Sequence, residues 1–201
     1  SFWVGHGGLE SPWSFLLWNS FSRGKKELFK GLAIDNLEKE WKQYPVFHFS
    51  FGGQNYVEPY TLEHVLEEFI ARAELLYGKD EFAKTLSSRF RAVLKKAHAK
   101  TGLRAVVLID EYDKPLLDVM DMDISVQNEY GKMTLEDYNR NLLKGVYSVF
   151  KEADDDLQFV LLTGVTKFSQ VSVFSGFNQP KDISMDPRYE SLCGITQEEM
   201  E

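Results

Sequence analysis

The sequence predicts an α/β fold, in which a parallel β-sheet is covered by helices on both faces. Two observations lead to this class. The stretches at residues 104–110 and 157–163 are apolar on both faces of the expected strand, which is typical of strands buried in a parallel sheet. Along the chain, such strands alternate with stretches whose apolar residues recur at helical spacing, and this order is typical of sheets whose strands are connected by helices.

The overall composition narrows the classes of protein to which the chain can belong. Its 201 residues suit one domain with a substantial core, and 43% hydrophobic and 27% charged residues are ordinary for a globular protein. The formal net charge of -8 argues against direct binding of this segment to nucleic acid or to an anionic membrane. No apolar run approaches the length of a membrane span, and residues 1–8 do not resemble a signal peptide.

Cysteine, histidine and the chain ends add three expectations. The single cysteine, Cys193, excludes an internal disulfide bond and fits a reducing compartment, so we expect a cytoplasmic protein. The four histidines lie far apart without cysteine at metal-ligand spacing, so a structural zinc site is not expected. The chain starts without methionine and ends on TQEEME, which resembles the beginning of a helix. We therefore interpret it as a fragment, incomplete at both ends.

Strand and helix signals are clear in the first half of the chain. Residues 44–51, YPVFHFSF, predict a strand by their aromatic and β-branched content, and Gly52 and Gly53 follow it. Residues 61–77 predict a helix that ends at Gly78 and carries an apolar stripe of Leu62, Val65, Leu66, Phe69, Ile70, Ala73 and Leu76. A second helix is expected at about residues 80–100, with a stripe of Phe82, Leu86, Phe90, Val93, Leu94 and Ala97.

The second half of the chain continues the alternation. After the strand at 104–110, residues 134–137 resemble a capping box and predict a helix that runs to about Ala153. Its inward positions are Leu135, Tyr138, Leu142, Val146, Val149 and Phe150. The acidic residues 154–156 predict a solvated turn before the last apolar strand, at 157–164. We expect the strands at 44–50, 104–110 and 157–163 to be parallel neighbours.

Polar residues follow two of these strands at the sheet edge where open α/β proteins bind their ligands. Asp110 and Glu111 end one strand, and Thr163 and Gly164 end the other. Many nucleotide-hydrolysing enzymes use a pair of carboxylates at the end of a buried strand to hold Mg²⁺ and to orient a water molecule. The alternative for Asp110 and Glu111 is a charged exit from a strand, and the alternative for Thr163 is an ordinary turn residue.

Phosphate-binding residues are harder to identify. The loop that cradles phosphates in many nucleotide-binding proteins, GxxxxGK[ST], is absent from the sequence. Gly5, Gly7 and Gly8 could direct backbone amides at an anion, or they could form only a flexible turn. Lys167 could reach a phosphate, or it could be a solvated lysine.

Several motifs together resemble one known family. They are ELFKGLAI, YPVFHFSF, VVLIDEYDKPLLD, FVLLTGVTKFSQVSVFSGFNQPKDIS and YESLCGIT, in this order over about residues 24–201. The family is the predicted AAA-ATPase-like family of P-loop proteins, which are often followed by a PD-(D/E)XK nuclease-like domain. The resemblance implies a P-loop NTPase-like parallel sheet that uses ATP and Mg²⁺. It also implies that Asp110 is the Walker B aspartate that binds Mg²⁺, that Glu111 activates water, and that Thr163 lies near the γ-phosphate.

Residues 1–23 depart from the family pattern. Family members have a phosphate loop of the form FLGRPRRFGKSLxLSTME here, whereas this chain has SFWVGHGGLESPWSFLLWNSFSR. One nucleotide sequence can encode both, because codons for RPRRFGKSL give GHGGLESP when they are read one base further along. We therefore interpret residues 1–23 as a frame-shifted phosphate-loop region and residues 24–201 as the AAA-ATPase-like domain. A divergent N-terminus and an unrelated tag are the alternatives.

This departure has two expected consequences. Glu10 takes approximately the place of the phosphate-binding lysine, and Pro12 interrupts the start of the helix, although Ser11 keeps a hydroxyl group. We therefore expect weak ATP binding or none. Loss of the ordinary first strand would also leave an apolar sheet edge beside the strand at 157–163, with a risk of aggregation or dimerisation, unless residues 2–4 fill part of the gap.

The resemblance implies that the intact protein hydrolyses ATP to drive a neighbouring effector, such as a nuclease-like domain C-terminal to this segment. The alternative is a non-catalytic module that keeps the fold for binding a protein partner. Nuclease activity within the segment is not expected, since no downstream (D/E)xK strand accompanies Asp110 and Glu111. The effector, the trigger of hydrolysis, the oligomeric state and the roles of Asp113 and Lys114 stay open. For Lys114, a phosphate contact and an ion pair with Asp113 or Asp118 both fit.

Overall fold

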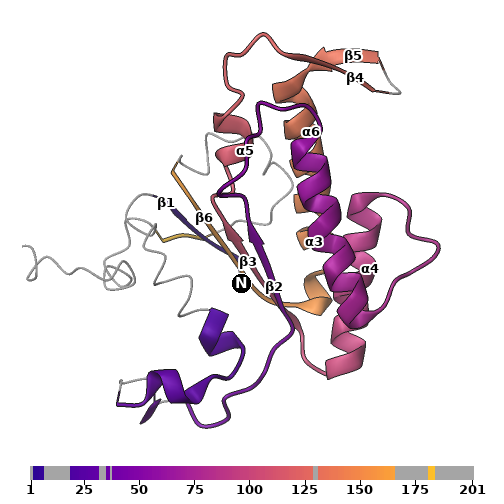
Figure 1. Ribbon diagram of the computed structural model, residues 1–201. Helices are drawn as coiled ribbons and strands as arrows, with labels where there is room; N and C mark the ends of the chain where they lie inside the picture. The colour runs from indigo at the N-terminus through magenta and orange to yellow at the C-terminus, as the bar shows by residue number, and fades with distance from the viewer. Residues whose placement is uncertain are drawn as a thin grey trace, which may run out of the picture.

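The computed structural model describes residues 2–6, 19–31, 35–36, 38–128, 131–165 and 181–183 of the chain. Within these residues a parallel five-stranded sheet has the strand order β2-β3-β6-β1-β7 (Figure 1). The strands are β1 Phe2–His6, β2 Val46–Ser50, β3 Ala105–Asp110, β6 Leu157–Gly164 and β7 Lys181–Asp182. A separate antiparallel hairpin contains β4 Ser125–Asn128 and β5 Gly131–Thr134. The α/β class predicted from the sequence is therefore confirmed.

The three strands predicted to be parallel neighbours are β2, β3 and β6, and they lie side by side. Ser50 is opposite Asp110 across the first pair, and Ile109 is opposite Leu162 across the second. β3 is buried along nearly its whole length, which explains why its sequence is apolar at every position rather than at alternate ones.

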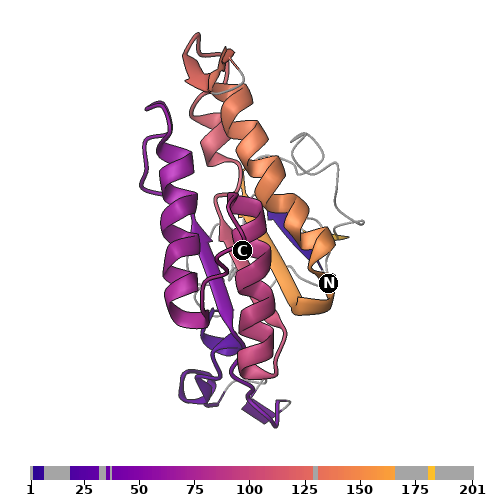
Figure 2. The ribbon, with the colours of Figure 1, turned by 90° about the vertical axis from the view of Figure 1, so that its right-hand side faces the viewer.

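Three long helices cover one face of this sheet, as Figures 1 and 2 show. They are α3 Thr61–Tyr77, α4 Leu86–Thr101 and α6 Leu135–Glu152. Their apolar stripes join alternate residues of the strands, such as Val107 and Ile109, in the main hydrophobic core. The opposite face carries Val106 and Leu108 in a second buried cluster. No long helix of the described residues packs there, so the second helical layer predicted from the sequence stays a prediction.

None of the helices in the described part of the chain combines the length and the apolar character that a membrane span requires.

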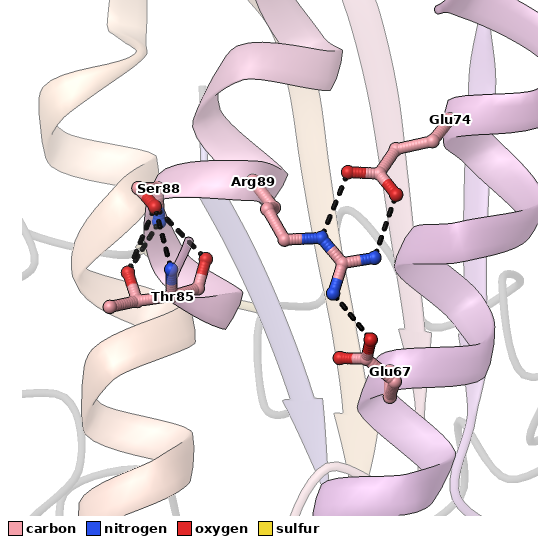
Figure 3. Close-up of polar contacts among 5 residues, drawn as sticks. All are labelled: Glu67, Glu74, Thr85, Ser88 and Arg89. Carbon is pink, nitrogen blue, oxygen red and sulfur yellow. Dashed lines mark hydrogen bonds and ion pairs between the residues drawn. The ribbon is translucent and has the colours of Figure 1, made fainter. Parts of the chain in front are cut away.

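Helix α3 has the bounds predicted from its periodicity, whereas α4 begins later than expected. Thr85 is the N-cap of α4: its side chain accepts a hydrogen bond from the backbone N–H of Ser88, whose hydroxyl in turn accepts from the backbone N–H of Thr85 (Figure 3). This reciprocal cap starts the helix at Leu86 and leaves Phe82 in the preceding loop, 94% exposed. Phe82 and the 64% exposed Leu76 are therefore wrong as predicted core residues.

A largely buried ion pair joins α3 to α4 (Figure 3). The guanidinium of Arg89 donates from Nε to Oε1 of Glu74 at 2.9 Å and from Nη2 to Oε2 at 2.7 Å. Its Nη1 donates to Glu67 at 2.5 Å. The hydrogen bonds from Arg89 hold the pKa of Glu74 below its ordinary value, although burial opposes this shift. Because two parallel bonds fix both position and orientation, the pair sets how the two helices lie against each other.

β1 decides between the two outcomes expected for the sheet edge beside β6. Residues 2–6 pair in parallel with β6, from Phe2 opposite Val160 to His6 opposite Gly164, and β7 pairs with the other side of β1. Residues 2–4 therefore fill the place beside β6, which is the second of the two outcomes expected for this edge. Backbone N–H and C=O groups make these ladder bonds, so strands of quite different sequence can occupy this position.

The start of α6 follows the predicted capping pattern. The side chain of Thr134 accepts a hydrogen bond from the backbone N–H of Asp137 at 3.1 Å. The short helix α5 Lys114–Leu117 and the β4–β5 hairpin, which lie between β3 and α6, were not predicted. The acidic turn before β6 is the 3-10 helix η2 Asp154–Asp156, and its residues are exposed or half-buried.

Candidate functional site

Parallel pairing brings three of the predicted site residues, Gly5, Asp110 and Thr163, to one edge of the sheet. Ser50 is opposite Asp110 in the β2–β3 pair, and Gly5 is opposite Thr163 in the β1–β6 pair. Because all these strands run in the same direction, their carboxyl ends meet at this edge, where ligands bind in open parallel sheets. Gly5, Asp110 and Thr163 thus lie at the same edge, although they are far apart in the sequence.

A short hydrogen bond joins the two residues that the sequence placed at the centre of the site. The hydroxyl group of Thr163 donates to Oδ1 of Asp110 at 2.6 Å. Thr163 is only 3% exposed, so its hydroxyl needs a partner inside the protein, and Asp110 supplies one. The second oxygen of Asp110 makes no hydrogen bond to a described residue, and this half-buried carboxylate can still bind a cation.

Glu111 adopts an unusual backbone conformation directly after β3. Its φ is 53°, in the left-handed region that non-glycine residues rarely occupy. The Glu111 carboxylate lies against Gly52, where an added Cβ atom would be 2.7 Å from Oε1 of Glu111. Gly52 therefore leaves space that the glutamate side chain uses. Such strained conformations cluster at functional sites, because the surrounding contacts must hold them in place.

The segment after Glu111 is anchored to the end of β6. The backbone N–H of Tyr112 donates to the carbonyl oxygen of Thr163 at 2.9 Å. An added Cβ atom at Gly164 would lie 2.6 Å from Oδ1 of Asp113 and 2.7 Å from the ring of Tyr112. Both side chains are buried, with exposures of 1% for Asp113 and 0% for Tyr112. Asp113, whose role the sequence left open, is thus a buried carboxylate beside the site.

The same segment is tied to helix α6. Nδ2 of the buried Asn139 donates to the carbonyl oxygen of Pro115 at 2.9 Å. The hydroxyl of Tyr147 donates to the carbonyl oxygen of Tyr112 at 3.5 Å, and burial raises the pKa of Tyr147 well above its ordinary value. These two hydrogen bonds connect the segment after β3 directly to α6.

Lys114 forms an ion pair with Asp118, at 2.9 and 3.0 Å from its two carboxylate oxygens. Of the alternatives that the sequence left open for Lys114, the ion pair with Asp118 is the one found in this structure. The pair spans one turn of α5 and steadies this short helix.

His48 is a neighbour of the site that the sequence did not single out as a candidate. It lies two residues before Ser50 on β2, opposite Leu108, and its Nδ1 is 3.4 Å from Nδ2 of Asn19. Burial lowers the pKa of His48, while the charge of Asp110 acts in the opposite direction. The alternation of side chains could have revealed it, since His48 has the same parity as Ser50, which is opposite Asp110.

The remaining predicted binding residues are Gly5, Gly7, Gly8, Ser11 and Lys167. The backbone of Gly5 pairs opposite Thr163 in the ladder between β1 and β6. Gly7, Gly8, Ser11 and Lys167 lie outside the described residues, so their expected roles are untested.

The donor set at this edge suits Mg²⁺ held together with a phosphate ligand. No group of three or more His, Cys, Asp and Glu side chains gathers as a metal site within the described ranges. Mg²⁺ differs from zinc in that one or two carboxylates commonly hold it, with substrate phosphates and water completing its shell. Asp110, oriented by the Thr163 hydroxyl, provides such a carboxylate.

Comparison with known proteins relates the sequence of this chain to a family. A family profile described as "Predicted AAA-ATPase" matches residues 15–174, which include Asp110, Glu111 and Thr163 but exclude Gly5 and Ser11. An uncharacterized protein in the vnfD 5′ region of Azotobacter chroococcum mcd 1 is 36% identical over 181 residues, covering 89% of this chain and 33% of that protein. The chain thus spans about one third of the length of this relative. No solved structure gives a significant match. The profile match over most of the chain, together with this parallel sheet, means that the chain belongs to the predicted AAA-ATPase-like family.

Proposed function

We propose that the intact protein binds and hydrolyses ATP with Mg²⁺ and that its nucleotide state drives a neighbouring effector. The observation that carries this proposal is the hydrogen bond from Thr163 to Asp110 at the carboxyl edge of the sheet, 2.6 Å long. It supports the proposal because it brings the acidic end of one strand and the polar end of the next into one site. Membership of a predicted ATPase family supports the same reaction class.

Each residue at this edge has a chemical role in the proposal. Asp110 would hold Mg²⁺, and Glu111 would orient the attacking water. The hydroxyl of the buried Thr163 would contact the γ-phosphate, and it keeps Asp110 oriented when no nucleotide is bound. When bound, Mg²⁺ would neutralise charge on the phosphate oxygens. Gly5, Gly7, Gly8, Ser11 and Lys167 are the proposed phosphate contacts.

The contacts after β3 support coupling to an effector. Tyr112 is bonded to Thr163, and Asn139 of α6 is bonded to Pro115, so a change at the nucleotide edge would reach α6 through a short chain of contacts. The relative is about three times as long as the matched segment, since that segment is 33% of it. We propose a C-terminal effector, of which a nuclease-like domain is one candidate, in a cytoplasmic protein.

In this chain we propose that ATP binding is impaired, because residues 1–23 represent the frame-shifted phosphate loop. The family profile begins at residue 15, so Glu10 and Ser11 lie outside the match. This supports a break before residue 15, whereas residues 15–23 lie inside the match. Resequencing the gene tests the frame shift directly. Codons that cannot yield the family motif in the shifted frame would refute it.

Titration with ATP and Mg²⁺ on two proteins tests the proposed function. One is this chain, and the other carries the family loop FLGRPRRFGKSL in place of the shifted segment. We expect saturable binding and turnover only in the restored protein. An Asp110→Asn variant of it should lose turnover, whereas Asp155→Asn, an exposed change of equal charge in η2, should not.

The other outcomes are equally informative. Micromolar binding by the unmodified chain would refute the proposed impairment. If neither protein binds although both fold, the ATPase assignment of this segment fails, and a module for binding a protein partner becomes the better account.

A further inference from the structure

A groove outside the nucleotide edge lies between the β4–β5 hairpin and the amino-terminal parts of α3 and α6, at the end of the molecule where Figure 1 shows the hairpin. Its volume is about 530 Å³. Tyr60, Glu63 and Tyr138 form its polar and aromatic walls, and Met133 and Leu142 contribute apolar surface. None of these residues has a part in the proposed ATP chemistry.

The hydrogen bonds of the two tyrosines determine what the groove can offer a ligand. The hydroxyl of Tyr60 donates to the backbone carbonyl of Gln127 at 2.8 Å. The hydroxyl of Tyr138 donates to Oε2 of Glu63 at 2.5 Å. Burial and this bond raise the pKa of Tyr138 above its ordinary value, so it keeps its proton. Both phenol protons are therefore used inside the protein, and these three side chains present only acceptor oxygens and aromatic surface.

The local charge also favours a cation. Glu63 lies in the first turn of α3, and Glu136 and Asp137 lie in the first turn of α6. Of these charged residues Glu63 lines the groove, whereas Glu136 and Asp137 lie beside it and are both paired with Arg140. The two helix ends add about half a positive charge each, which is less than the charge of Glu63 together with the one net negative charge of Glu136, Asp137 and Arg140. Lys132 pairs opposite Gln127, which lines the groove, but Lys132 itself is exposed and does not line it.

Tyr60 is held in a strained conformation at the edge of this groove. Its φ is 67°, in the left-handed region, where a non-glycine residue persists only if its surroundings fix it. The bond to Gln127 and the ring of Tyr138, 5.7 Å away in an edge-to-face arrangement at 87°, provide that fixation. The aromatic wall is thus built in advance of any ligand.

We propose that this groove binds a guanidinium or primary ammonium group, with the Glu63 carboxylate as counter-charge and Tyr60 and Tyr138 as aromatic walls. Carboxylates and aromatic faces are the two groups that proteins use to hold organic cations. Oε1 of Glu63 makes no hydrogen bond to a described residue, so it is the acceptor for the bound group. The cation can belong to a Lys or Arg side chain of a protein segment or to a free amine. This inference does not depend on ATP binding.

Titration with propylguanidinium, and with the neutral propylurea as a matched probe, tests the proposal on the chain as it exists. The methyl resonance of Met133 reports binding locally. We expect a saturable shift with propylguanidinium and none with propylurea. Glu63→Gln should weaken binding by about tenfold, whereas Glu68→Gln, which removes the same charge from an exposed site on α3, should change it by less than about twofold.

Glu63→Gln also changes the hydrogen bond from Tyr138 to Glu63. A second variant therefore tests the proposal while it leaves Glu63 in place. Asn141→Arg places a tethered guanidinium at the exposed rim and should abolish binding of the probe.

Tighter binding of an acetylated Ala-Arg-Ala amide than of spermidine would identify a protein side chain as the source of the cation, and the reverse would identify a free amine. Absence of saturable binding, equal binding of propylurea, or unchanged binding in both variants would overturn the proposal.

Discussion

The hydroxyl of Thr163 lies 2.6 Å from Oδ1 of Asp110, which links the carboxyl ends of β6 and β3. The two residues are 53 positions apart in the sequence, and parallel pairing alone makes them neighbours. Because Thr163 is buried and Asp110 is half-buried, the bond both stabilises the sheet edge and orients the carboxylate proposed to hold Mg²⁺.

Replacing Thr163 by valine tests the contribution of this bond. The substitution keeps the shape of the side chain but removes the donor, and we expect the free energy of unfolding to fall by about 1 kcal/mol, since half-buried Asp110 can recover part of the bond from water. Urea denaturation measures the change. Thr163→Ser keeps the hydroxyl and should retain most of the stability, so equal losses in both variants would contradict the assigned role.

Gly52→Ala tests the space that Glu111 occupies. The added Cβ would lie 2.7 Å from Oε1 of Glu111, which ends a flexible side chain that can move away. We therefore expect the free energy of unfolding to change by less than about 1 kcal/mol. In the protein with a restored phosphate loop, turnover of ATP should fall while ATP affinity stays the same. Unchanged turnover would argue against a role for the position of the Glu111 carboxylate.

Gly164→Ala should have a larger effect on stability. Its Cβ would lie 2.6 Å from Asp113 and 2.7 Å from the ring of Tyr112, and neither buried side chain has room to move. Overpacking of this kind lowers the free energy of unfolding by about 2 kcal/mol. Gly145→Ala is the matched control: its Cβ would meet only the Ser87 hydroxyl, at 3.0 Å, within helix α6, where alanine is favoured over glycine. A loss in Gly145→Ala as large as that in Gly164→Ala would contradict this account.

The Glu74–Arg89 pair predicts a pH dependence of stability. Arg89 lowers the pKa of Glu74 below its ordinary value of 4.5. The ion pair therefore stabilises the folded protein fully above pH 4.5, and this stabilisation is lost as the pH falls through the lower pKa of Glu74 in the folded state. At about pH 7, Glu74→Gln should remove about 2 kcal/mol of stability, since Arg89 keeps Glu67 as a partner.

Denaturation at several pH values measures this difference. The gap between the original protein and Glu74→Gln should narrow as the pH falls below 4.5. Glu68→Gln, at an exposed pair with Arg72, should differ little from the original protein throughout. A gap of constant size would show that the charge of Glu74 is not its cause.

Elements with strong local signals could be predicted closely. The bounds of α3, Thr61–Tyr77, follow from its apolar spacing and Gly78, and the start of α6 follows from the capping pattern at Thr134. The error at α4 has a local cause as well, because the cap formed by Thr85 and Ser88 overrides the apolar spacing that continues back to Phe82. The β4–β5 hairpin was missed since its strands are only four residues long.

The sequence by itself determined which strands are buried and which polar residues end them, because both are written in short stretches of the chain. Only the tertiary structure decided that β1 lies between β6 and β7, that Thr163 bonds to Asp110, and that Gly52 makes room for Glu111. It also decided that Tyr60, Glu63 and Tyr138 line one groove. These relationships join residues that lie far apart in the sequence. Strand order, packing and hydrogen bonding across the fold bring such residues together, so a local sequence pattern does not predict them.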